Sequence, residues 1–138
     1  MALPKLNTPT YELELPSTAE KIKYRPFLVK EQKVLMMAQD SGEDQQIAEA
    51  MGNLVSSCTF GKVDAETSPM FDLEYVFLKV RGKSVGETVQ LSLICPDDEK
   101  TTVPVNLKLD DIEVQMLDNH TNEINISESV KVVFRYPL

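Results

Sequence analysis

The residue types that could do chemistry are few and scattered along this 138-residue chain. The one histidine, His120, lies in a run of Asp, Asn and Thr, with no serine or cysteine nucleophile in a recognisable motif. Gly82-Lys83-Ser84 copies the end of a phosphate-binding loop, but Phe77 stands where that motif requires its first glycine. The triplet also follows an expected helix instead of opening one. We therefore expect no catalytic residue and interpret the triplet as the end of a helix.

Acidic residues gather in two short runs, at 97–99 and at 110–113. Such loops bind a divalent cation where a fold brings them together, but solvated turn residues are the simpler interpretation. Cys95-Pro96 has the form of half a zinc-binding turn, yet Asp98 stands in the place of the second cysteine. We expect no metal and no cofactor. One enzymatic alternative stays open, a metal-dependent hydrolase that would use Asp97, Asp98, Asp110, Asp111 and His120.

Composition and charge exclude several function classes. Hydrophobic residues make up 42% of the chain and charged residues 26%, which is ordinary for a soluble globular domain, and the length suits a single domain over residues 1–138. The net charge of −8 disfavours nucleic acid and anionic membranes as partners. No apolar run approaches the roughly 20 residues that span a bilayer. Residues 1–5 lack the apolar core of a signal peptide, so we expect the protein to stay where it is made.

Residues 10–26 predict a β-hairpin. Tyr11 to Leu15 alternates apolar with acidic residues, and Lys21 to Arg25 alternates apolar with basic residues. Opposite charges on the two solvent-facing sides favour antiparallel pairing. Pro26 closes the second strand.

Residues 29–86 predict a helical segment with three helices. The first runs from Val29 to Gln39, and the second from Glu43 to Cys58. Cys58 continues the apolar stripe of the second helix, so we interpret it as a buried, reduced thiol. Thr67-Ser68-Pro69 predicts the start of the third helix with a hydroxyl cap, and Gly82 or Gly86 its end.

From residue 88 to residue 136 the apolar period changes to two, which predicts a small antiparallel β-rich region. Alternating runs begin at Thr88 and return at Val103, and Pro104 marks the return as an edge strand. We expect a short third strand at 112–114 and a last one at 130–134. The fold class is therefore α+β: an N-terminal β-hairpin, a three-helix segment, then the β-rich region.

The third helix has apolar residues on almost every side. Such a helix is either central to its domain or covered by a partner. Lys79, Arg81 and Lys83 form the one dense basic cluster of the sequence, which complements the helix dipole or, through the forked guanidinium of Arg81, reaches an acidic group on a partner. We expect the partner-binding residues to be Phe71, Tyr75, Leu78, Lys79, Arg81 and Lys83.

Two stretches resemble a known family. Both resemble segments of the baseplate hub protein family of T4-like contractile-tailed bacteriophages. Lys23 to Lys33 is similar to the family segment R-P-F-x-V-K-E-x-K. Phe71 to Glu87 is similar to the family signature F-D-x-E-Y-L-F-L-x-x-R-x-K-S-V-G-E. Residues 135–137 also resemble a family element. Some relatives carry a cysteine pair where this chain has Cys95 and Asp98, so a metal-stapled turn is not expected here.

The resemblance implies a noncatalytic late viral protein of tail assembly, either a component of the baseplate's central hub or a hub assembly factor. It would work in the host bacterial cytoplasm during assembly or in the virion tail baseplate. Its implied partners are other tail and hub subunits, with the tape-measure protein as a candidate, while the net charge argues against nucleic acid and membrane. A homo-oligomer is a further candidate state. From the residues alone, a soluble protein-binding module of another kind fits equally well.

Overall fold

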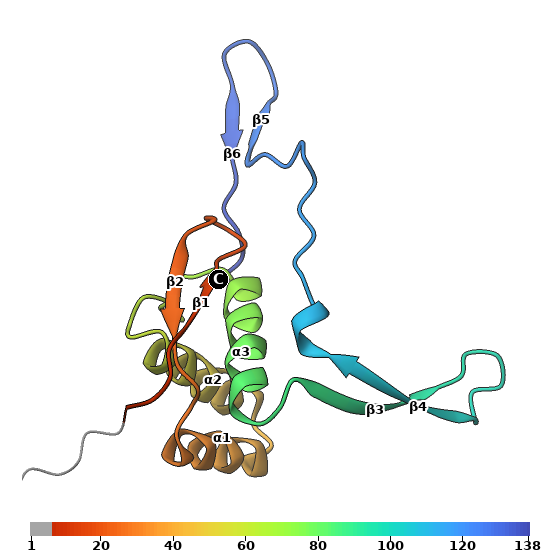
Figure 1. Ribbon diagram of the computed structural model, residues 1–138. Helices are drawn as coiled ribbons and strands as arrows, with labels where there is room; N and C mark the ends of the chain where they lie inside the picture. Colours follow the sequence, from red (N-terminus) through yellow and green to blue (C-terminus); the bar gives the residue numbers. More distant parts are fainter. Residues whose placement is uncertain (1–6) are drawn as a thin grey trace, which may run out of the picture.

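A computed structural model describes residues 7–138, so the prediction made from residues 1–5 lies outside the described residues. Within that range three two-stranded antiparallel sheets flank three helices, which confirms the α+β class. Two of the sheets project from the helical body as ribbons (Figure 1). The order is β1 (Tyr11–Glu14), β2 (Lys21–Tyr24), α1 (Val29–Ser41), α2 (Asp44–Cys58), α3 (Met70–Ser84), β3 (Thr88–Ile94), β4 (Thr102–Lys108), the 3-10 turn η1 (Leu109–Asp111), β5 (Glu123–Asn125) and β6 (Lys131–Val133).

The β1–β2 hairpin forms as the charge pattern predicts. Glu12 lies opposite Lys23, and the Lys23 Nζ is 3.8 Å from the Glu12 Oε1. Leu13 lies opposite Ile22, and both side chains point inward and are buried. The hairpin thus presents an apolar face to the helices and a charged face to solvent.

Helix α3 is central to the body. Leu73, Val76 and Val80 are buried against the β1–β2 hairpin and α2, where Val55 and Cys58 are fully covered. Burial raises the pKa of the Cys58 thiol to about 11, which agrees with its interpretation as a small buried hydrophobe. Of the two alternatives for this helix, the central position applies to these residues. Within residues 7–138 no helix is long and apolar enough to cross a membrane.

Two local predictions are wrong. Residues 112–114 form no strand, because they lie in the linker between η1 and β5 and have no strand beside them. The hydroxyl cap of α3 is also absent: Pro69 occupies the cap position, and no side chain caps the first turn. With ψ at 144°, Pro69 has an extended and not a helical backbone. The proline therefore precedes the helix, which begins at Met70, and does not lie in its first turn.

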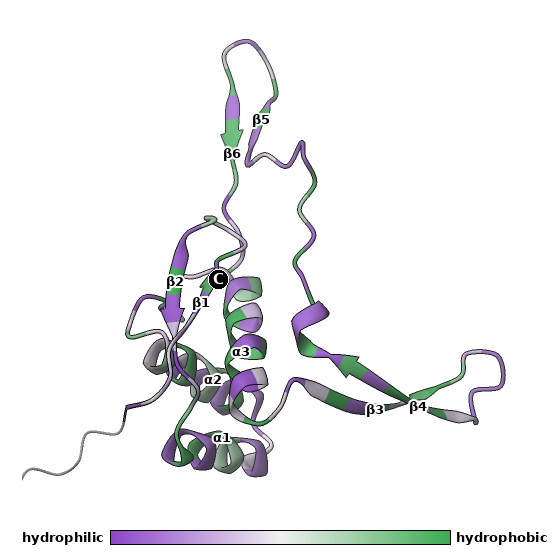
Figure 2. Cartoon of the chain, in the orientation of Figure 1, coloured by the Kyte–Doolittle hydropathy of each residue, from purple (hydrophilic) through white to green (hydrophobic). Residues whose placement is uncertain are grey.

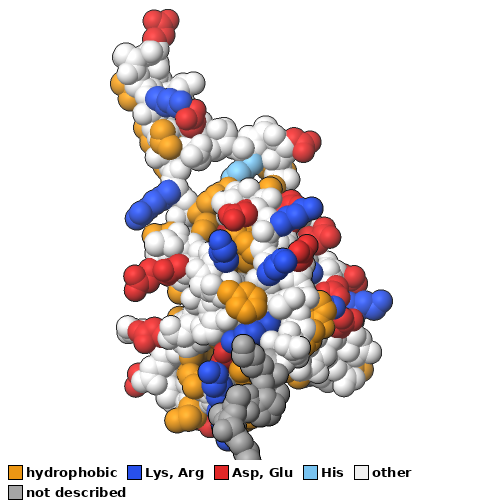
Figure 3. All heavy atoms as spheres, turned by 60° about the vertical axis from the view of Figure 1, so that its left-hand side comes forward, with side chains coloured by type: hydrophobic (Ala, Val, Ile, Leu, Met, Phe, Trp, Pro, Cys, Tyr) orange, Lys and Arg blue, Asp and Glu red, His pale blue; other side chains and the backbone are white. Residues whose placement is uncertain are grey.

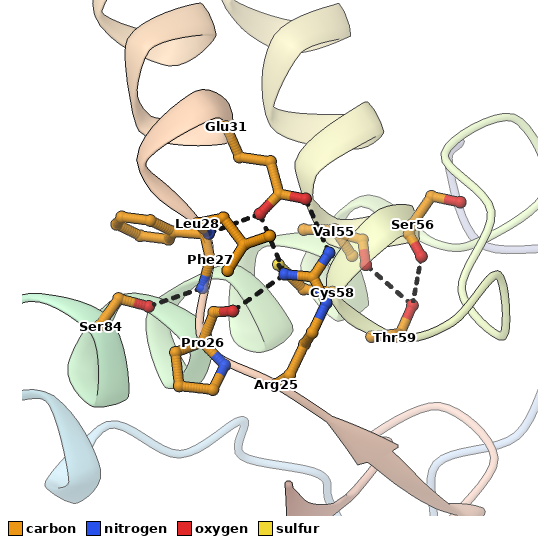
Figure 4. A network of polar contacts seen from close by, with 10 residues as sticks. All are labelled: Arg25, Pro26, Phe27, Leu28, Glu31, Val55, Ser56, Cys58, Thr59 and Ser84. Atoms are coloured by element: carbon orange, nitrogen blue, oxygen red, sulfur yellow. Dashed lines mark hydrogen bonds and ion pairs between the residues drawn. The ribbon is translucent and has the colours of Figure 1, made fainter. Parts of the chain in front are cut away.

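A mostly buried ion pair joins the hairpin to the helices (Figure 4). The Arg25 guanidinium donates Nη1 to Glu31 Oε2 at 3.0 Å and Nη2 to Glu31 Oε1 at 2.7 Å. Only 13% of the Arg25 side chain and 11% of the Glu31 side chain are exposed. Glu31 also accepts a hydrogen bond from the backbone N–H of Leu28 at 2.7 Å. The backbone N–H of Arg25 donates to the Cys58 carbonyl at 2.9 Å. One pair therefore fixes the end of β2, the start of α1 and the end of α2.

Two further polar contacts tie α3 into this arrangement. Asp72, which is buried, accepts hydrogen bonds from the backbone N–H and the hydroxyl of Ser17, in the turn between β1 and β2. At the other end of the helix, the Phe27 N–H donates to the Ser84 hydroxyl at 3.0 Å. Both ends of α3 are thereby fixed to the N-terminal part of the body.

Glu31→Gln is expected to destabilise the protein by about 3 kcal/mol at neutral pH, because it leaves the Arg25 charge buried without its partner. The hydrogen bonds from Arg25 lower the folded-state pKa of Glu31. A lowered pKa contributes stability above the unfolded pKa, near 4.3, and that contribution is lost as pH falls through the folded value. The difference in unfolding free energy between wild type and variant should therefore shrink in acid.

Chemical denaturation of both proteins over a pH series measures this effect. Glu12→Gln is the matched control, because its ion pair with Lys23 is mostly exposed and should contribute little. A Glu31→Gln variant as stable as wild type at neutral pH would contradict the assigned role of the pair.

Candidate protein-binding surface

The base of the β3–β4 ribbon is held against the end of α3. Leu109, the first residue of η1, is buried, and a β-carbon placed on Gly82 would lie 4.0 Å from its Cβ. The Lys79 Nζ donates to the Asp110 carbonyl at 3.1 Å and lies 3.8 Å from the Asp110 Oδ1. The Lys83 Nζ lies 3.8 Å from the Asp110 Oδ2. Apolar contact and ion pairs together set the position at which the ribbon leaves the body.

The chain returns to the opposite end of α3 after the β5–β6 ribbon. The Met70 N–H donates to the Pro137 carbonyl at 3.3 Å, and the Phe71 ring packs edge-on against Tyr136 with centroids 4.9 Å apart. The Tyr136 hydroxyl lies 2.8 Å from the Nε2 of His120. Helix α3 therefore carries the base of one ribbon at each end.

The six residues expected to bind a partner are all half-buried on α3. The Lys79 ammonium lies 5.2 Å from the centre of the Tyr75 ring, and Lys83 pairs with Glu87. The Arg81 Nη1 is buried and has no hydrogen-bond partner among the described residues. Lys79 and Lys83 thus make contacts inside the chain, while the partner-binding role of the six residues stays a prediction.

The structure does not bring together the residues of the hydrolase alternative. Asp97 and Asp98 lie at the tip of the β3–β4 ribbon, where the Asp98 carboxylate accepts the N–H groups of Lys100 and Thr101 at 3.1 and 3.0 Å. Asp110 lies at the base of the same ribbon. Within residues 7–138 no group of three or more His, Cys, Asp or Glu side chains is arranged to hold a metal ion.

One face of the β3–β4 ribbon is apolar and uncovered. Its cross-strand pairs are Val89 with Leu107, Leu91 with Val105, and Leu93 with Val103. Apart from Val89, which is half-buried, these side chains are between 36% and 52% exposed. The opposite face is mostly polar. Figure 2 shows apolar segments on both strands, away from the helices. We call these side chains the ribbon face: Val89, Leu91, Leu93, Val103, Val105 and Leu107.

The β5–β6 ribbon is also poorly covered. Figure 3 shows hydrophobic side chains at its surface, with charged side chains of both signs spread over the body below. An open pocket of about 610 Å³ lies at its base, and Pro69, Phe134 and Leu138 are among the residues lining it. The exposed apolar residues in and beside this ribbon are Ile124, Ile126, Val130, Val133 and Phe134.

Sequence reasoning placed the candidate surface on α3 and did not identify the ribbon face. The signal was present as the period-two pattern of 88–108, which predicts strands with one apolar side. The pattern does not reveal whether another element covers that side. Within residues 7–138 the β3–β4 sheet has only two strands, and the apolar side chains of the ribbon face stay exposed.

Residues 8–138 match the family model described as T4 bacteriophage base plate protein. No curated protein and no solved structure matches the chain. The match covers nearly the whole sequence, and the chain belongs to this family.

Leu109→Ala is expected to loosen the β3–β4 ribbon more than the body. Removing a buried leucine side chain costs about 2–5 kcal/mol, and here the lost contacts hold only the ribbon base. Hydrogen exchange at the amides of Val89, Leu91 and Leu93 should accelerate about tenfold or more, while α2 amides change little. The comparison variant, Asp110→Asn, breaks half-exposed ion pairs and should have a small effect. Equal acceleration in the ribbon and in α2 would contradict this local role.

Proposed function

We propose that this protein is a noncatalytic tail morphogenesis protein, a component or assembly factor of the baseplate's central hub, that acts through protein–protein contacts. Membership of the T4 bacteriophage base plate protein family supports a place in the baseplate. The observation that carries the contact role is the uncovered ribbon face.

A two-stranded ribbon with one exposed apolar side is only marginally stable by itself in water. Isolated two-stranded hairpins are marginally stable in water and usually need a third strand or a packed layer. Burying one aliphatic side chain fully contributes about 1.5–3 kcal/mol relative to full exposure. Several such side chains in one patch supply the apolar centre that interfaces require.

The body and the ribbons divide the work in this proposal. Residues that carry the resemblance make contacts inside the body: Arg25 with Glu31, Asp72 with Ser17, and Ser84 with Phe27. They position the ribbons, and the ribbon face meets the partner. The half-buried α3 residues Phe71, Tyr75, Leu78, Lys79, Arg81 and Lys83 form a second proposed contact region along α3, between the bases of the two ribbons.

The partners that fit are other tail and hub subunits, including the tape-measure protein. A net charge of −8 makes nucleic acid and anionic membranes poor partners. A noncatalytic role agrees with the separation of the acidic residues and His120, which belong to different parts of the fold.

Val105→Asp tests the ribbon face. A charge placed at the centre of the face opposes its burial, so capture of baseplate proteins by the tagged chain should fall about tenfold or more. The measurement is co-expression with the tail and baseplate proteins of the same phage, followed by pull-down. Asn106→Asp introduces the same charge on the opposite side of β4 and should leave capture intact. Retention of every partner by Val105→Asp would remove the ribbon face from the proposal.

Mass spectrometry of purified mature particles separates the two forms of the proposed role. A hub component is expected in fixed ratio to the other hub proteins. An assembly factor is expected in tail intermediates and not in mature particles. Absence from both would contradict the proposed place in hub assembly.

A further inference from the structure

The outer edge of β3 can be located from its hydrogen bonds. The Leu109 N–H donates to the Glu87 carbonyl at 2.8 Å, and the Cys95 N–H donates to the Thr101 carbonyl at 2.8 Å. These bonds lie at the two ends of the β3–β4 ladder. In an antiparallel ladder the hydrogen-bonded residues alternate with residues whose N–H and C=O groups point outward. Counting inward from both ends, the outward residues of β3 are Thr88, Gln90, Ser92 and Ile94.

The two edges of the ribbon differ in how they are protected. The outward residues of β4 include Pro104, which has no N–H, and the charged Lys108. The corresponding residues of β3 include neither a proline nor a charge, and no charged residue lies anywhere in 88–94. Within residues 7–138 no other strand pairs with either edge. The edge of β3 is therefore the unprotected one.

We propose that two copies of this chain pair through this edge, with their β3 strands antiparallel and Leu91 of one copy opposite Leu91 of the other. In this register Gln90 lies opposite Ser92 and Thr88 opposite Ile94, so outward backbone groups meet outward backbone groups. The result is one four-stranded sheet around a two-fold axis. Val89, Leu91 and Leu93 of both copies then lie on the same side, which joins the two ribbon faces into one.

Charge favours the antiparallel orientation of the two copies over the parallel one. Pairing buries no charged side chain, because β3 has none. Asp97, Asp98 and Glu99 lie at the ribbon tip, while Lys79 and Lys83 beside its base already pair with Asp110 and Glu87. Antiparallel pairing places the two acidic tips at opposite ends of the four-stranded sheet, whereas parallel pairing would place them together. A contact in which one patch meets its own copy closes as a two-fold dimer.

This inference goes beyond the proposed function, since it uses the β3 edge and not the ribbon face. Light scattering of the full chain over a dilution series is expected to give twice the 15.5 kDa chain mass at high concentration. Ser92→Pro removes an outward N–H and leaves the β3–β4 ladder complete, so the dissociation constant of the dimer should rise about tenfold or more. The matched control is Asn106→Pro, which makes the same change on the outer edge of β4 and should leave the dimer intact.

The register has its own test. In a Cys95→Ser background, Leu91→Cys places two thiols at a non-hydrogen-bonded pair, where Cα atoms lie about 4.5 Å apart, within the range that a disulfide spans. Oxidation should give a covalent dimer. Gln90→Cys faces Ser92 of the other copy and should not cross-link.

A chain that stays monomeric throughout the dilution series overturns this inference. So does a dimer whose dissociation constant rises equally with Ser92→Pro and with Asn106→Pro. So does cross-linking that is equal at positions 90 and 91. The capture assay with Val105→Asp is independent of these results. A monomer that still captures baseplate proteins leaves the proposed function standing, and a dimer that captures none supports the edge pairing alone.

Discussion

The forked contact between Arg25 and Glu31 is the constraint on which the rest of the structure depends. It lies where β2, α1 and the end of α2 meet, and both side chains are nearly covered. A mostly buried charge needs its partner, because leaving it unpaired costs about 3 kcal/mol. By fixing the end of β2, the pair holds the β1–β2 hairpin over α3. That cover buries one side of α3, and both ribbons are attached to this helix.

The body and the ribbons follow opposite rules. In the body each element is fixed by a specific polar contact together with apolar packing, as at Asp72 with Ser17 and at Leu109 beside Gly82. In the β3–β4 ribbon the apolar side chains are aligned across the strands but nothing covers them. In a small domain most of the apolar residues that can be buried pack around one helix, so few are available to cover its extensions. Membership of a baseplate family agrees with this division, since such a protein works among neighbours.

Much of this fold could be predicted from local patterns. The alternating charges of 11–25 predict the first hairpin, and the period of two from residue 88 predicts β3 and β4. The contacts that organise the body could not be predicted, because they join residues without a common period: Ser17 meets Asp72 across 55 positions. At residues 112–114 the pattern predicts a strand that does not form, because alternating apolar residues make a strand only where another strand is available for pairing. The ribbon face was visible as a pattern, but its exposure depends on tertiary structure.

The return of the chain to α3 has a consequence for the order in which the molecule is built. Residues 85–135 leave one end of α3 and come back to the other, where Pro137 meets Met70 and Tyr136 meets Phe71. A ribosome makes α3 before residues 136 and 137, so the body is able to form while this large loop is still open. Closing it costs entropy that grows only slowly with its length. We therefore expect the β5–β6 ribbon to be fixed last, so that a nascent chain would present its body to the cell before a complete binding surface.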